Sequence, residues 1–353
     1  MSKRLKTLAK LAIICASFVP SLAPQISIAA PTQYLQSPLF LQMLDELETE
    51  HQFNRQDLVT LFSDVYQRDD ILEAMSKPAE KTKTWSDYKP IFVNDLGTKR
   101  GVEFWQKHEA ILSKAAAEFK IPEAIIVAII GVETRYGNYK GKHKVIEALS
   151  TLAFAYPPRS AFFYGQLKQF LILSRQLAWD PHAILGSYAG AMGYAQFIPS
   201  SYLKLAIDYN GDGVPDLINS PDDAIGSIAN YFRHHEWQPE APVLLPAKKV
   251  KPESEVMLNM MNKPLDPTIT LEQAAKAGLV LETSRRGDFL VRPFTFINEG
   301  EEELWFGLKN FFVITEYNHS KLYARAVFEL ATAVESKYQK ATNKSPHLPL
   351  AIQ

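Results

Sequence analysis

The sequence predicts a mainly α-helical protein with a small β-containing insert. Apolar residues recur at helical spacing over most of residues 35–238. Residues 239–293 differ, because they are rich in proline and contain only short, strand-like segments such as Val243-Leu-Leu245 and Phe289–Arg292. A final helical pattern runs from Leu322 to Tyr338. At 353 residues, the chain can form one large domain with appendages, or two to three domains.

The N-terminus has the three parts of a secretory signal. A basic start is followed by the apolar run Leu11–Val19 and then by small residues up to Ala30. We therefore expect export and cleavage after Ala29. Cys15 follows Ile14, where a lipoprotein signal has a small residue, so lipidation is not expected. An uncleaved signal would still tether the protein to a membrane.

Charge and cysteine content exclude several functions. Removal of residues 1–29 takes away four basic residues and no acid, which changes the net charge from −1 to −5. A nucleic-acid-binding surface is therefore not expected. The only cysteine leaves with the signal, so the mature chain has no disulfide and no thiol chemistry.

The first part of the mature chain is predicted to be helical. Apolar residues follow helical spacing from Leu35 to about residue 80, and Asn54 suits a helix N-cap. The pattern loosens over Trp85–Val93. An amphipathic helix is then predicted from Gly101 to Phe119.

The most informative stretch is an apolar run that ends on an acid, Glu133. Pro122 suits the first position of a helix, and Glu123 follows in the turn where the helix dipole favours negative charge. No residue from Ala124 to Val132 is polar. Because about ten residues cannot span a bilayer, we expect a helix buried on all sides in the protein core.

Its position gives Glu133 a chemical role. Desolvation and the partial negative charge of a helix C-terminus both disfavour an ionised carboxyl, so we expect Glu133 to hold a proton near neutral pH. Such a group acts as a general acid toward a glycosidic oxygen. The alternative is that Glu133 only pairs with Arg135 or Lys144, as the first polar residue after a core helix.

More helix is predicted from Val145 to Trp179, with a break at Tyr156–Arg159 where two prolines force an extended bend. The segment Gly186–Ser201 has three glycines in eight residues. Glycines so placed allow the backbone to approach a ligand closely. A tight loop packed on a neighbouring helix is the alternative. Another helix is predicted over Ala224–Trp237.

A calcium-type loop begins at Asp208. Oxygen-bearing side chains occupy its positions one, three, five and nine, and Gly213 is at position six, as in an EF-hand. The ligands of this loop would be Asp208, Asn210, Asp212, Val214, Asp216 and Asn219. Asn219 stands where a bidentate Glu is standard, so weak or structural binding is expected, with Asp222 or Asp223 able to supply a missing ligand. The alternative is a metal-free loop of Asx turns.

Near the C-terminus, a turn is predicted at Asn298–Glu301, between strand-like segments at Phe294–Ile297 and Glu303–Phe306. Phe311–Thr315 is a further strand candidate. His319 precedes the closing helix, where we interpret it as a cap or a packed residue rather than a base.

Four segments, in this order, resemble the motifs of the bacterial lytic murein transglycosylase B family. They are Gly131–Gly137, Gly186–Tyr202, Asp223–Phe232 and Tyr317–Ser320. The resemblance extends over roughly residues 35–338 and implies a lysozyme-like helical catalytic core with a lone Glu, a preceding helical domain, a small β-containing domain and a calcium loop.

The resemblance and the patterns together give an expected division of the chain. It comprises a signal peptide (1–29), an N-terminal helical domain (30–110), a lysozyme-like catalytic core with the calcium-type loop (111–238), a small β-containing domain (239–305) and a C-terminal segment whose helix returns to the core (306–353).

The resemblance also implies a reaction. Glu133 would protonate the oxygen between MurNAc and GlcNAc and then act as base for the MurNAc 6-hydroxyl, which closes onto C1 to give a 1,6-anhydro sugar without water. Substrate contacts are implied at Arg159, Ser187, Gln196, Tyr231, Tyr317, Asn318 and Tyr323. Pro158 replaces the second member of the family's arginine pair, which implies weaker peptide recognition.

The resemblance implies a lyase that works in the periplasm on the cell wall. One structural Ca²⁺ and no organic cofactor are expected. The partners are peptidoglycan glycan strands and, further, cell-wall synthesis or division proteins, and the chain is expected to be a monomer.

Other functions fit parts of the same sequence. A hydrolytic muramidase would use the same core, because pocket geometry decides whether water or the 6-hydroxyl attacks. An inactive peptidoglycan-binding scaffold is disfavoured by the presence of Glu133 within its motif. A calcium sensor would need paired loops, and the sequence has one. Histidine spacings of metal sites, Gly-x-Ser-x-Gly elbows and phosphate loops are absent.

Overall fold

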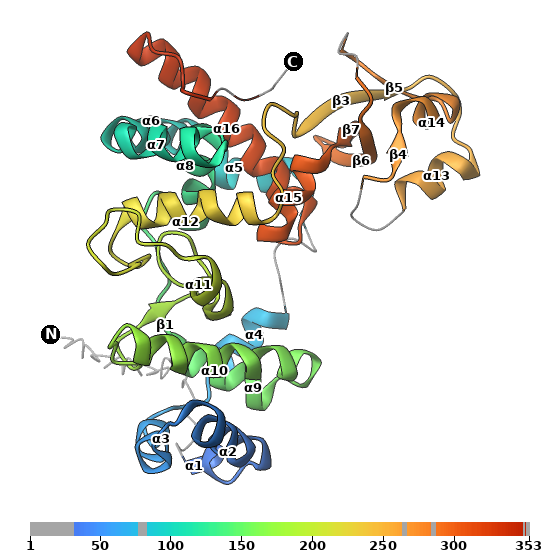
Figure 1. Ribbon diagram of the computed structural model, residues 1–353. Coiled ribbons are helices and arrows are strands. Elements are labelled where there is room, and N and C mark those ends of the chain that lie inside the picture. The colour runs from blue at the N-terminus through green and yellow to red at the C-terminus, as the bar shows by residue number, and fades with distance from the viewer. Residues whose placement is uncertain (1–31, 77–82, 263–266, 284–286, 349, 351–353) are drawn as a thin grey trace, which may run out of the picture.

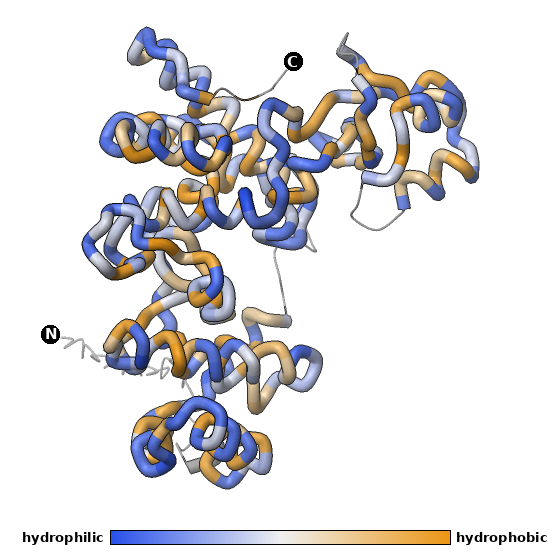
Figure 2. Tube along the Cα trace, viewed as in Figure 1, coloured by the Kyte–Doolittle hydropathy of each residue, from blue (hydrophilic) through white to orange (hydrophobic). Residues whose placement is uncertain are grey.

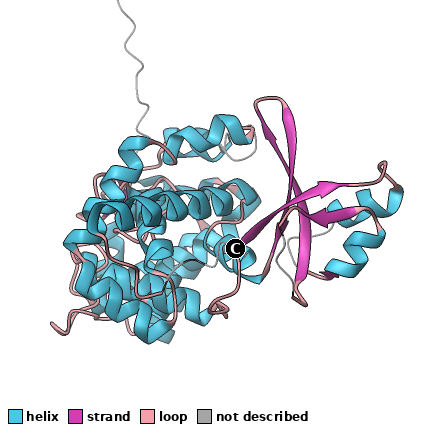
Figure 3. Cartoon of the chain, turned by 90° about the horizontal axis from the view of Figure 1, so that it is seen from above, coloured by secondary structure: helices cyan, strands magenta, loops and turns pink. Residues whose placement is uncertain are grey.

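The computed structural model describes residues 32–76, 83–262, 267–283, 287–348 and 350. The expected signal peptide and Cys15 lie outside these residues. Helices stacked in successive layers make up most of the molecule, and a β-containing unit projects to one side (Figure 1). Seen from above, the strands lie apart from the helical body (Figure 3). The expectation of a mainly helical protein with a small β-containing unit is confirmed.

The N-terminal helices form the outermost helical layer. They are α1 (Thr32–Leu35), α2 (Pro38–His51) and α3 (Arg55–Phe62), whereas α4 (Asp69–Ser76) follows them in the chain and lies outside this layer (Figure 1). Asn54 is the N-cap of α3 and accepts a hydrogen bond from the backbone N–H of Asp57 at 3.0 Å, as the sequence predicted. These helices contact α9 (Val145–Ala155) and α10 (Ser160–Gln176).

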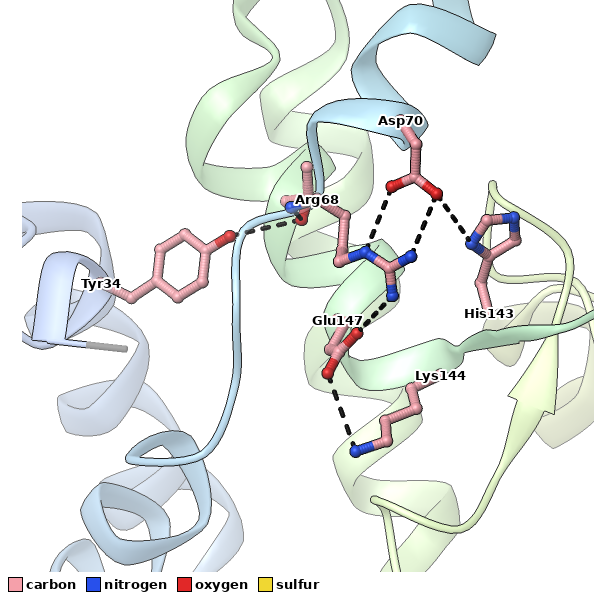
Figure 4. Close-up of polar contacts among 7 residues, drawn as sticks. Tyr34, Arg68, Asp70, His143, Lys144 and Glu147 are labelled. Atoms are coloured by element: carbon pink, nitrogen blue, oxygen red, sulfur yellow. Dashed lines mark hydrogen bonds and ion pairs between the residues drawn. The ribbon is translucent and has the colours of Figure 1, made fainter. Parts of the chain in front are cut away.

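A polar cluster fastens this layer to α9 (Figure 4). Arg68 precedes α4, and its guanidinium donates to Glu147 at 2.9 Å and to Asp70 at 3.0 Å. The backbone N–H of Arg68 donates to Thr151 at 3.0 Å, and Tyr34 lies within hydrogen-bond distance of the same hydroxyl. Because Glu147 is almost fully buried, loss of Arg68 would leave a buried charge without its partner.

The core of the helical body is built around α8. Its members are α5 (Trp85–Phe92), α6 (Asp95–Lys107), α7 (Glu109–Phe119), α8 (Glu123–Thr134) and α16 (Lys321–Thr342). The loosened pattern over residues 85–93 is helical, because Thr84 and Asp87 form a capping box at its start. The predicted helix 101–119 is two helices that meet at His108, whose imidazole contacts Asp222 at 3.1 Å.

The middle of the chain supplies the neighbouring layers. They contain α9, the 3₁₀ turn η2 (Pro157–Arg159), α10, α11 (Pro199–Leu205) and α12 (Pro221–His234), with the short strands β1 (His143–Lys144) and β2 (Leu185–Gly186). The break predicted at the two prolines is confirmed, since α9 ends at Ala155 and η2 separates it from α10. Ser220 caps α12 by accepting a hydrogen bond from the N–H of Asp223. The helix therefore begins at Pro221, three residues before the predicted start at Ala224.

The β-containing unit is one antiparallel sheet with two short helices. It comprises β3 (Leu244–Lys249), α13 (Glu255–Met261), β4 (Ile269–Thr270), α14 (Leu271–Lys276), β5 (Leu279–Leu281), β6 (Leu290–Asn298) and β7 (Glu301–Gly307). The strand order is β4-β6-β7-β3-β5. This unit has a hydrophobic cluster of its own, separate from the main core.

The predicted hairpin is confirmed, and its turn is tighter than expected. Asn298 and Glu301 pair across β6 and β7, which leaves Glu299 and Gly300 as the turn residues. Both have positive φ, at 51° and 86°, as the hairpin turn that matches strand twist requires. Asn298, which was expected to be a turn residue, ends β6, and its side-chain amide donates to Glu303.

The strand predicted at Phe311–Thr315 is wrong, because these residues belong to α15 (Lys309–Tyr317). All five are buried, so the run has no alternation of exposed and buried faces. A short apolar run cannot distinguish a buried helix from a buried strand. The amide of Asn310 decides the packing here, since it donates to the carbonyls of Gln238 and Ala241.

Arg325 on α16 joins the β-containing unit to the helical body. The side chain is almost fully buried, and its guanidinium lies over the rings of Trp85, Phe296 and Trp305 at 4.3–4.8 Å. It donates to Glu303 at 2.5 Å. Since the contacts come from α5, β6 and β7, one buried cation fixes the sheet against the helix that also carries Tyr323.

Hydrophobic residues are spread through every layer instead of forming one long stretch (Figure 2). Among the residues described, no helix combines the length and the apolar character needed to cross a membrane.

The chain end returns to the start of α8. The buried carboxylate of Glu123 accepts hydrogen bonds from the backbone N–H groups of His347 and Leu348 at 2.8 and 3.0 Å. Glu335 on α16 accepts from the N–H of Leu350 at 3.0 Å. Burial raises the pKa of Glu335 from its ordinary 4.5 to about 7, and the charge of Glu123 acts in the same direction.

This environment predicts a pH-dependent stability. The folded state binds the Glu335 proton more tightly than the unfolded chain, so its contribution is complete below about pH 4.5 and is lost as the pH rises through about 7. We expect Glu335→Gln, which cannot ionise, to be more stable than the wild type at pH 8 by up to about 3 kcal/mol. Urea denaturation at pH 5 and pH 8 measures this difference, with exposed Glu301→Gln as control. Parallel pH profiles of wild type and Glu335→Gln would contradict it.

Candidate active site

The buried helix α8 exposes one side chain, that of Glu133. Every other residue from Glu123 to Thr134 is buried, so the prediction of a helix enclosed on all sides is confirmed. Helices α6, α7, α12 and α16 all contact it. Glu133 lies in the last turn and is partly exposed. The core therefore holds this carboxyl at a fixed place and leaves it accessible.

The end of α8 is an unusual sequence of left-handed residues. Arg135, Tyr136 and Gly137 have φ values of 51°, 62° and 83°. Side chains rarely adopt this conformation, so the first two residues are held there by their surroundings. The hydroxyl of Thr134 contributes, since it donates to the Ile130 carbonyl and accepts from the Gly137 N–H, both at 3.0 Å. The turn that follows Glu133 is thus tied back to the helix.

Two glycines make room for the ring of Tyr136. A Cβ added to Gly101 on α6 or to Gly131 on α8 would lie 2.6 Å from the Tyr136 hydroxyl oxygen. The ring therefore occupies the space between the two helices where each lacks a side chain. We expected the glycines of the later Gly186–Ser201 segment to matter for close approach, but sequence reasoning gave no such role to Gly131 or Tyr136, although both lie in the motif around Glu133.

Tyr323 is the side chain that meets Glu133. Its hydroxyl donates to Oε1 of Glu133 at 2.5 Å from the first turn of α16. Burial, together with the charge of Glu133, raises the pKa of Tyr323 well above that of a free phenol. The same two causes raise the pKa of Tyr317. Both phenols therefore stay protonated over the working pH range and remain hydrogen-bond donors.

The alternative interpretation, in which Glu133 pairs with Arg135 or Lys144, stays a prediction. Lys144 lies 3.8 Å from Glu147, on α9. Arg135 follows the helix in left-handed conformation and is exposed. A hydrogen bond from the Tyr323 hydroxyl supports this carboxyl.

Tyr317 and Tyr231 belong to one aromatic cluster beside this carboxyl. Their ring centroids are 4.7 Å apart, and Phe197 packs against both at 5.6–5.8 Å. The Tyr317 hydroxyl donates to the Ala195 carbonyl at 2.5 Å, and the Tyr231 hydroxyl to the Glu316 carbonyl at 2.7 Å. The phenols thus hold the backbone of the glycine-containing segment and of α15 in place.

The segment Gly186–Ser201 is a tight loop of short antiparallel bridges. Gly186 pairs with Met192, and Met192 with Phe197. The Ser187 hydroxyl accepts from the N–H of Ala191 at 3.0 Å. A Cβ at Gly190 would overlap Leu149 of α9. The loop therefore packs closely on a helix, as the alternative interpretation of its glycines held.

Gln196 has a left-handed backbone, with φ of 47°. Its amide donates to the carbonyls of Gly193 and Lys140, at 2.9 and 3.2 Å. The bond to Lys140 places the loop next to the turn that follows Glu133. The bond from Tyr317 to Ala195 holds the same loop from α15.

Two of the residues expected to contact substrate, Arg159 and Asn318, lie outside the aromatic cluster. Arg159 lies at the end of η2, exposed, with its guanidinium over the ring of Phe162 at 4.4 Å. Asn318 ends α15 beside Tyr317 and is partly exposed. His319 is exposed and is not the cap of α16, because Ser320 has that role. The structure therefore places Tyr323 and Tyr317 close to Glu133, with Tyr231 packed on Tyr317, and leaves Arg159 exposed beside Phe162.

The calcium-type loop is held by hydrogen bonds that its own side chains make to its backbone and to one another. Asp208 accepts from the N–H groups of Gly211, Asp212 and Gly213 at 2.7–3.1 Å. Asn219 donates its amide to Asp216 at 2.9 Å. Within the part of the chain described, no three carboxylate, imidazole or thiolate groups are close enough to hold a metal ion. The oxygen donors are of the type that Ca²⁺ takes, but they are arranged here as Asx turns.

The two acids that were expected to supply a missing ligand, Asp222 and Asp223, have other partners in this arrangement. Asp223 is fully buried, and its carboxylate accepts from the N–H groups of Tyr209, Asn210 and Asp216 at 2.8–3.1 Å. Asp222 contacts His108. Asp223 thus holds the loop onto α12, and Asp222 links α12 to the junction of α6 and α7.

The loop also supports the active-site turn. The N–H of Tyr194 donates to the Leu217 carbonyl at 2.8 Å, and Lys140 donates to the Ile218 carbonyl at 2.7 Å. The Tyr194 ring lies against Gly137. A contact path therefore runs from the loop to the turn that follows Glu133.

A mainly helical core that presents one carboxyl at the end of a buried helix, with a tyrosine hydroxyl donating to it, defines the class of lysozyme-like enzymes that cleave glycosidic bonds. The comparisons with known proteins identify the family. The model of the transglycosylase SLT domain matches residues 37–332.

Individual relatives agree. Over 311 residues the chain is 37% identical to membrane-bound lytic murein transglycosylase B of Escherichia coli (strain K12), which covers 85% of this chain and 84% of that protein. The structure resembles catenated lytic transglycosylase SltB1 from Pseudomonas aeruginosa, with TM-score 0.80, 41% identity and coverage of 86% of this chain and 99% of that one. It also resembles the Escherichia coli lytic transglycosylase Slt35 in complex with calcium, with TM-score 0.78, 36% identity and coverage of 87% and 95%.

The chain therefore belongs to the transglycosylase SLT domain family. It is a peptidoglycan lytic transglycosylase, a lyase with a lysozyme-like helical core.

The close fit of Tyr136 against Gly131 generates a prediction. Gly131→Ala places a methyl group where the rigid Tyr136 ring now lies, so we expect a loss of about 1–3 kcal/mol of stability. Gly165→Ala is the matched control, because a Cβ at that helical position meets nothing within 4 Å. It should gain up to about 1 kcal/mol from helix propensity. Urea denaturation measures the free energy of unfolding of both variants. If the two substitutions changed it equally, the packing described for Tyr136 would be contradicted.

Proposed function

We propose that Glu133 is the single acid and base of the transglycosylase reaction. The observation that carries this proposal is the position of its carboxyl, the one accessible side chain of α8, with the Tyr323 hydroxyl 2.5 Å from Oε1. Among the described residues, Glu133 is the carboxylate whose charge acts on both Tyr317 and Tyr323. Glu316 acts instead on Tyr231 and His235.

In the first step, Glu133 donates its proton to the oxygen that links MurNAc to GlcNAc. The bond from C1 of MurNAc to that oxygen breaks, GlcNAc leaves with a free 4-hydroxyl, and C1 takes on oxocarbenium character. Glu133 is then a carboxylate, and the Tyr323 hydroxyl stabilises it by a charge-assisted hydrogen bond. That Glu133 carries the proton near neutral pH at the start stays a prediction.

In the second step, Glu133 takes the proton of the MurNAc 6-hydroxyl as that oxygen bonds to C1. The product is 1,6-anhydroMurNAc, and Glu133 regains the proton it gave away, so no water is consumed. A tethered hydroxyl competes well against water, because effective molarities for well-oriented groups reach about 10⁵–10⁸ M. The aromatic cluster of Phe197, Tyr231 and Tyr317 supports this outcome, because burial and the charge of Glu133 both raise the pKa of Tyr317, which places an aromatic neighbour close to the carboxyl.

We assign substrate contacts to residues near the carboxyl. Tyr317, Tyr231 and Tyr323 provide aromatic faces and hydroxyls, and Gln196 and Ser187 provide polar groups of the neighbouring loop. Asn318 is the accessible amide at the end of α15. Arg159, exposed on its own surface, would contact substrate further along the glycan strand or its peptide.

The calcium-type loop is proposed to bind one Ca²⁺ as a structural ion. Asp208, Asn210, Asp212, Asp216 and Asn219 offer oxygen atoms at EF-hand positions, with the carbonyl of Val214 at the seventh. Slt35, a relative, has a structure in complex with calcium. Binding would replace the internal hydrogen bonds of the Asx turns, and Asn219 offers one oxygen in place of two, so we expect weak affinity.

Peptidoglycan glycan strands are the substrate in this proposal, and the chain works as a monomer in the periplasm after export. Proteins of cell-wall synthesis or division are its further partners. The relative of Escherichia coli is named as membrane-bound; for this chain we propose a cleaved signal peptide over residues 1–29, because Ile14 before Cys15 does not fit a lipoprotein signal.

The acid–base assignment predicts the behaviour of Glu133→Gln. The amide has nearly the same shape but cannot donate and retrieve a proton, so the variant should fold normally and lose about 10²–10⁴-fold in rate. Mass spectrometry of muropeptides released from purified sacculi measures the rate and the product. Wild-type products should end in 1,6-anhydroMurNAc, lighter by one water than muramidase products and inert to borohydride. Glu316→Gln is the control with an exposed acid near the site and should keep activity. If Glu133→Gln turned over substrate at the wild-type rate, the assignment of Glu133 as the acid and base would be wrong.

The calcium proposal predicts a thermal effect with little change in turnover. An ion that binds only the native state stabilises it by mass action, so calcium should raise the melting temperature by a few degrees, roughly. Asp208→Ala combined with Asp212→Ala should abolish this rise in melting temperature. Asp222→Asn should retain it, because Asp222 contacts His108. A wild-type melting curve that chelator and calcium leave unmoved would show that the loop works without metal.

A further inference from the structure

The chain returns to the helical core after α16, and nothing in the proposed mechanism uses this return. Residues 344–348 and Leu350 lie against α7, the start of α8 and the second half of α16, and we call them the C-terminal strap. Lys344 donates to both carboxylate oxygens of Glu109 on α7, at 2.7 and 2.9 Å. Pro346 and Leu350 are buried. The strap lies beyond residue 332, where the match to the family ends.

The strap supplies the hydrogen-bond partners of two buried carboxyl groups. The two oxygens of Glu123 accept from the backbone N–H groups of His347 and Leu348, at 2.8 and 3.0 Å. Oε1 of Glu335 accepts from the N–H of Leu350 at 3.0 Å. The side chains of Glu123 and Glu335 are only 0% and 4% exposed, so water cannot replace these donors. Removal of the strap would therefore leave two buried carboxyl groups without their partners, which costs free energy.

The helices α8 and α16 are antiparallel neighbours that are joined at two places. Tyr323, in the first turn of α16, donates to Glu133 in the last turn of α8. Ten residues earlier on α8, a distance of about 15 Å along the helix, the strap joins Glu123 to Glu335. The helix pair thus has a direct contact at the Glu133 end and an indirect one, through the strap, at the other end.

The residue before Glu335 belongs to the packing that holds the turn after α8. A Cβ added to Gly101 on α6 would lie 2.5 Å from Cγ2 of Val334 and 2.6 Å from the hydroxyl oxygen of Tyr136. Val334 of α16 and the Tyr136 ring therefore meet α6 at the same glycine. Because Tyr136 belongs to that turn, a shift of this part of α16 would displace a group that packs beside it.

The charges of the two buried carboxyls determine how firmly the strap is held. Burial, together with the charge of Glu123, raises the pKa of Glu335 to about 7, and burial also raises the pKa of Glu123. As the pH rises through about 7, both groups become ionised, and two like charges repel each other in a buried site. The contribution of Glu335 to stability is complete below about pH 4.5 and is lost through about pH 7.

The other titratable groups around the strap act less directly. Lys344 lowers the pKa of Glu109, so these two form an ion pair over this pH range. Burial raises the pKa of Tyr338, on the next turn of α16, to about 12, so that phenol stays neutral. The exposed imidazole of His347 acts on Glu123 and opposes the effect of burial. Glu335 is therefore the group whose charge changes near neutral pH with burial on all sides.

We propose that the C-terminal strap holds α16 against α8 and thereby keeps the Tyr323 hydroxyl on Glu133, and that it loosens when Glu123 and Glu335 are both ionised. The inference rests on the proposed function, because a displaced Tyr323 affects turnover only if Glu133 is the acid and base. Glu123 and Glu335 are positioning residues in this proposal, since they contact no substrate and act through Tyr323.

The test compares the pH dependence of turnover in the full chain and in Glu335→Gln. The amide still accepts from Leu350 but cannot ionise, so the variant should keep the strap in place above pH 7. From pH 6 to pH 8, we expect kcat of the wild type to fall about 3- to 10-fold further than kcat of Glu335→Gln, with little change in KM, as loss of one hydrogen bond does. Glu133 is present in both proteins, so the ratio of their kcat values isolates the strap. Exposed Glu301→Gln is the matched control and should follow the wild type.

Amide hydrogen exchange measures the strap itself. Corrected for the intrinsic effect of pH, protection of the N–H groups of His347, Leu348 and Leu350 should be lost between pH 6 and pH 8 in the wild type and kept in Glu335→Gln. A chain shortened after Asn343 should already have the lower kcat at pH 6, and Glu335→Gln should no longer change it. If the shortened chain does not fold, the comparison of full-length Glu335→Gln with the wild type decides.

The outcomes separate this inference from the proposed function. If Glu335→Gln gains stability at pH 8 while its kcat follows the wild type at every pH, the strap is a structural support only and the inference is wrong. Unchanged protection of the wild-type strap from pH 6 to pH 8, or wild-type turnover by a folded shortened chain, would also overturn it. If Glu133→Gln retains activity, the proposed function fails instead, whatever the pH profiles show.

Discussion

Burial of α8 on every side is the constraint on which the rest of this structure depends. An apolar helix is stable in water only when other elements cover its whole circumference, and α6, α7, α12 and α16 do so here. Each buried side chain contributes about 1.5–3 kcal/mol relative to exposure, so the position of the helix is strongly fixed. The one residue that the packing leaves accessible, Glu133, is fixed with it. The protein thus uses its most hydrophobic element to fix the position of an accessible carboxyl.

The end of that helix is specified as closely as its body. The left-handed residues Arg135 and Tyr136 stay in that conformation because Thr134 ties the turn back and because the Tyr136 ring fills the space left by Gly101 and Gly131. Tyr323 then reaches the carboxyl from α16. The hydrogen bond between Tyr323 and Glu133 joins two helices, so a shift of α16 against α8 would break it. The same close helix packing therefore fixes both the turn and the carboxyl.

The outer parts of the molecule are attached to these central helices by a few buried polar groups. Arg325 joins the β-containing unit to α16, and Arg68 with Glu147 joins the N-terminal helices to α9. Asp223 holds the calcium-type loop onto α12 through three backbone N–H groups. In each case a buried charge has several partners, which makes the attachment specific in direction, because removal of one partner would leave a charge uncompensated. The surfaces around Glu133 are thereby built from segments that are far apart along the chain.

The sequence by itself determined the local features of this protein. The apolar run ending at Glu133 predicted a helix buried on all sides, since no polar face was available. The turn residues of Asn298–Glu301, between two strand-like segments, predicted a hairpin, and the prolines before Arg159 predicted a helix break. These predictions held because each depends on interactions between residues close in sequence. Only the tertiary structure decided the rest. Tyr323 lies 190 residues from Glu133, and no local pattern indicates that they meet. Phe311–Thr315 is helical because packing surrounds it completely, a fact that its strand-like composition could not reveal. The pairing of Gly131 with Tyr136, and the approach of Glu123 to Glu335 beside the C-terminal strap, likewise arise from helices that cross in space, where side chains meet according to their three-dimensional direction and not their spacing along the chain.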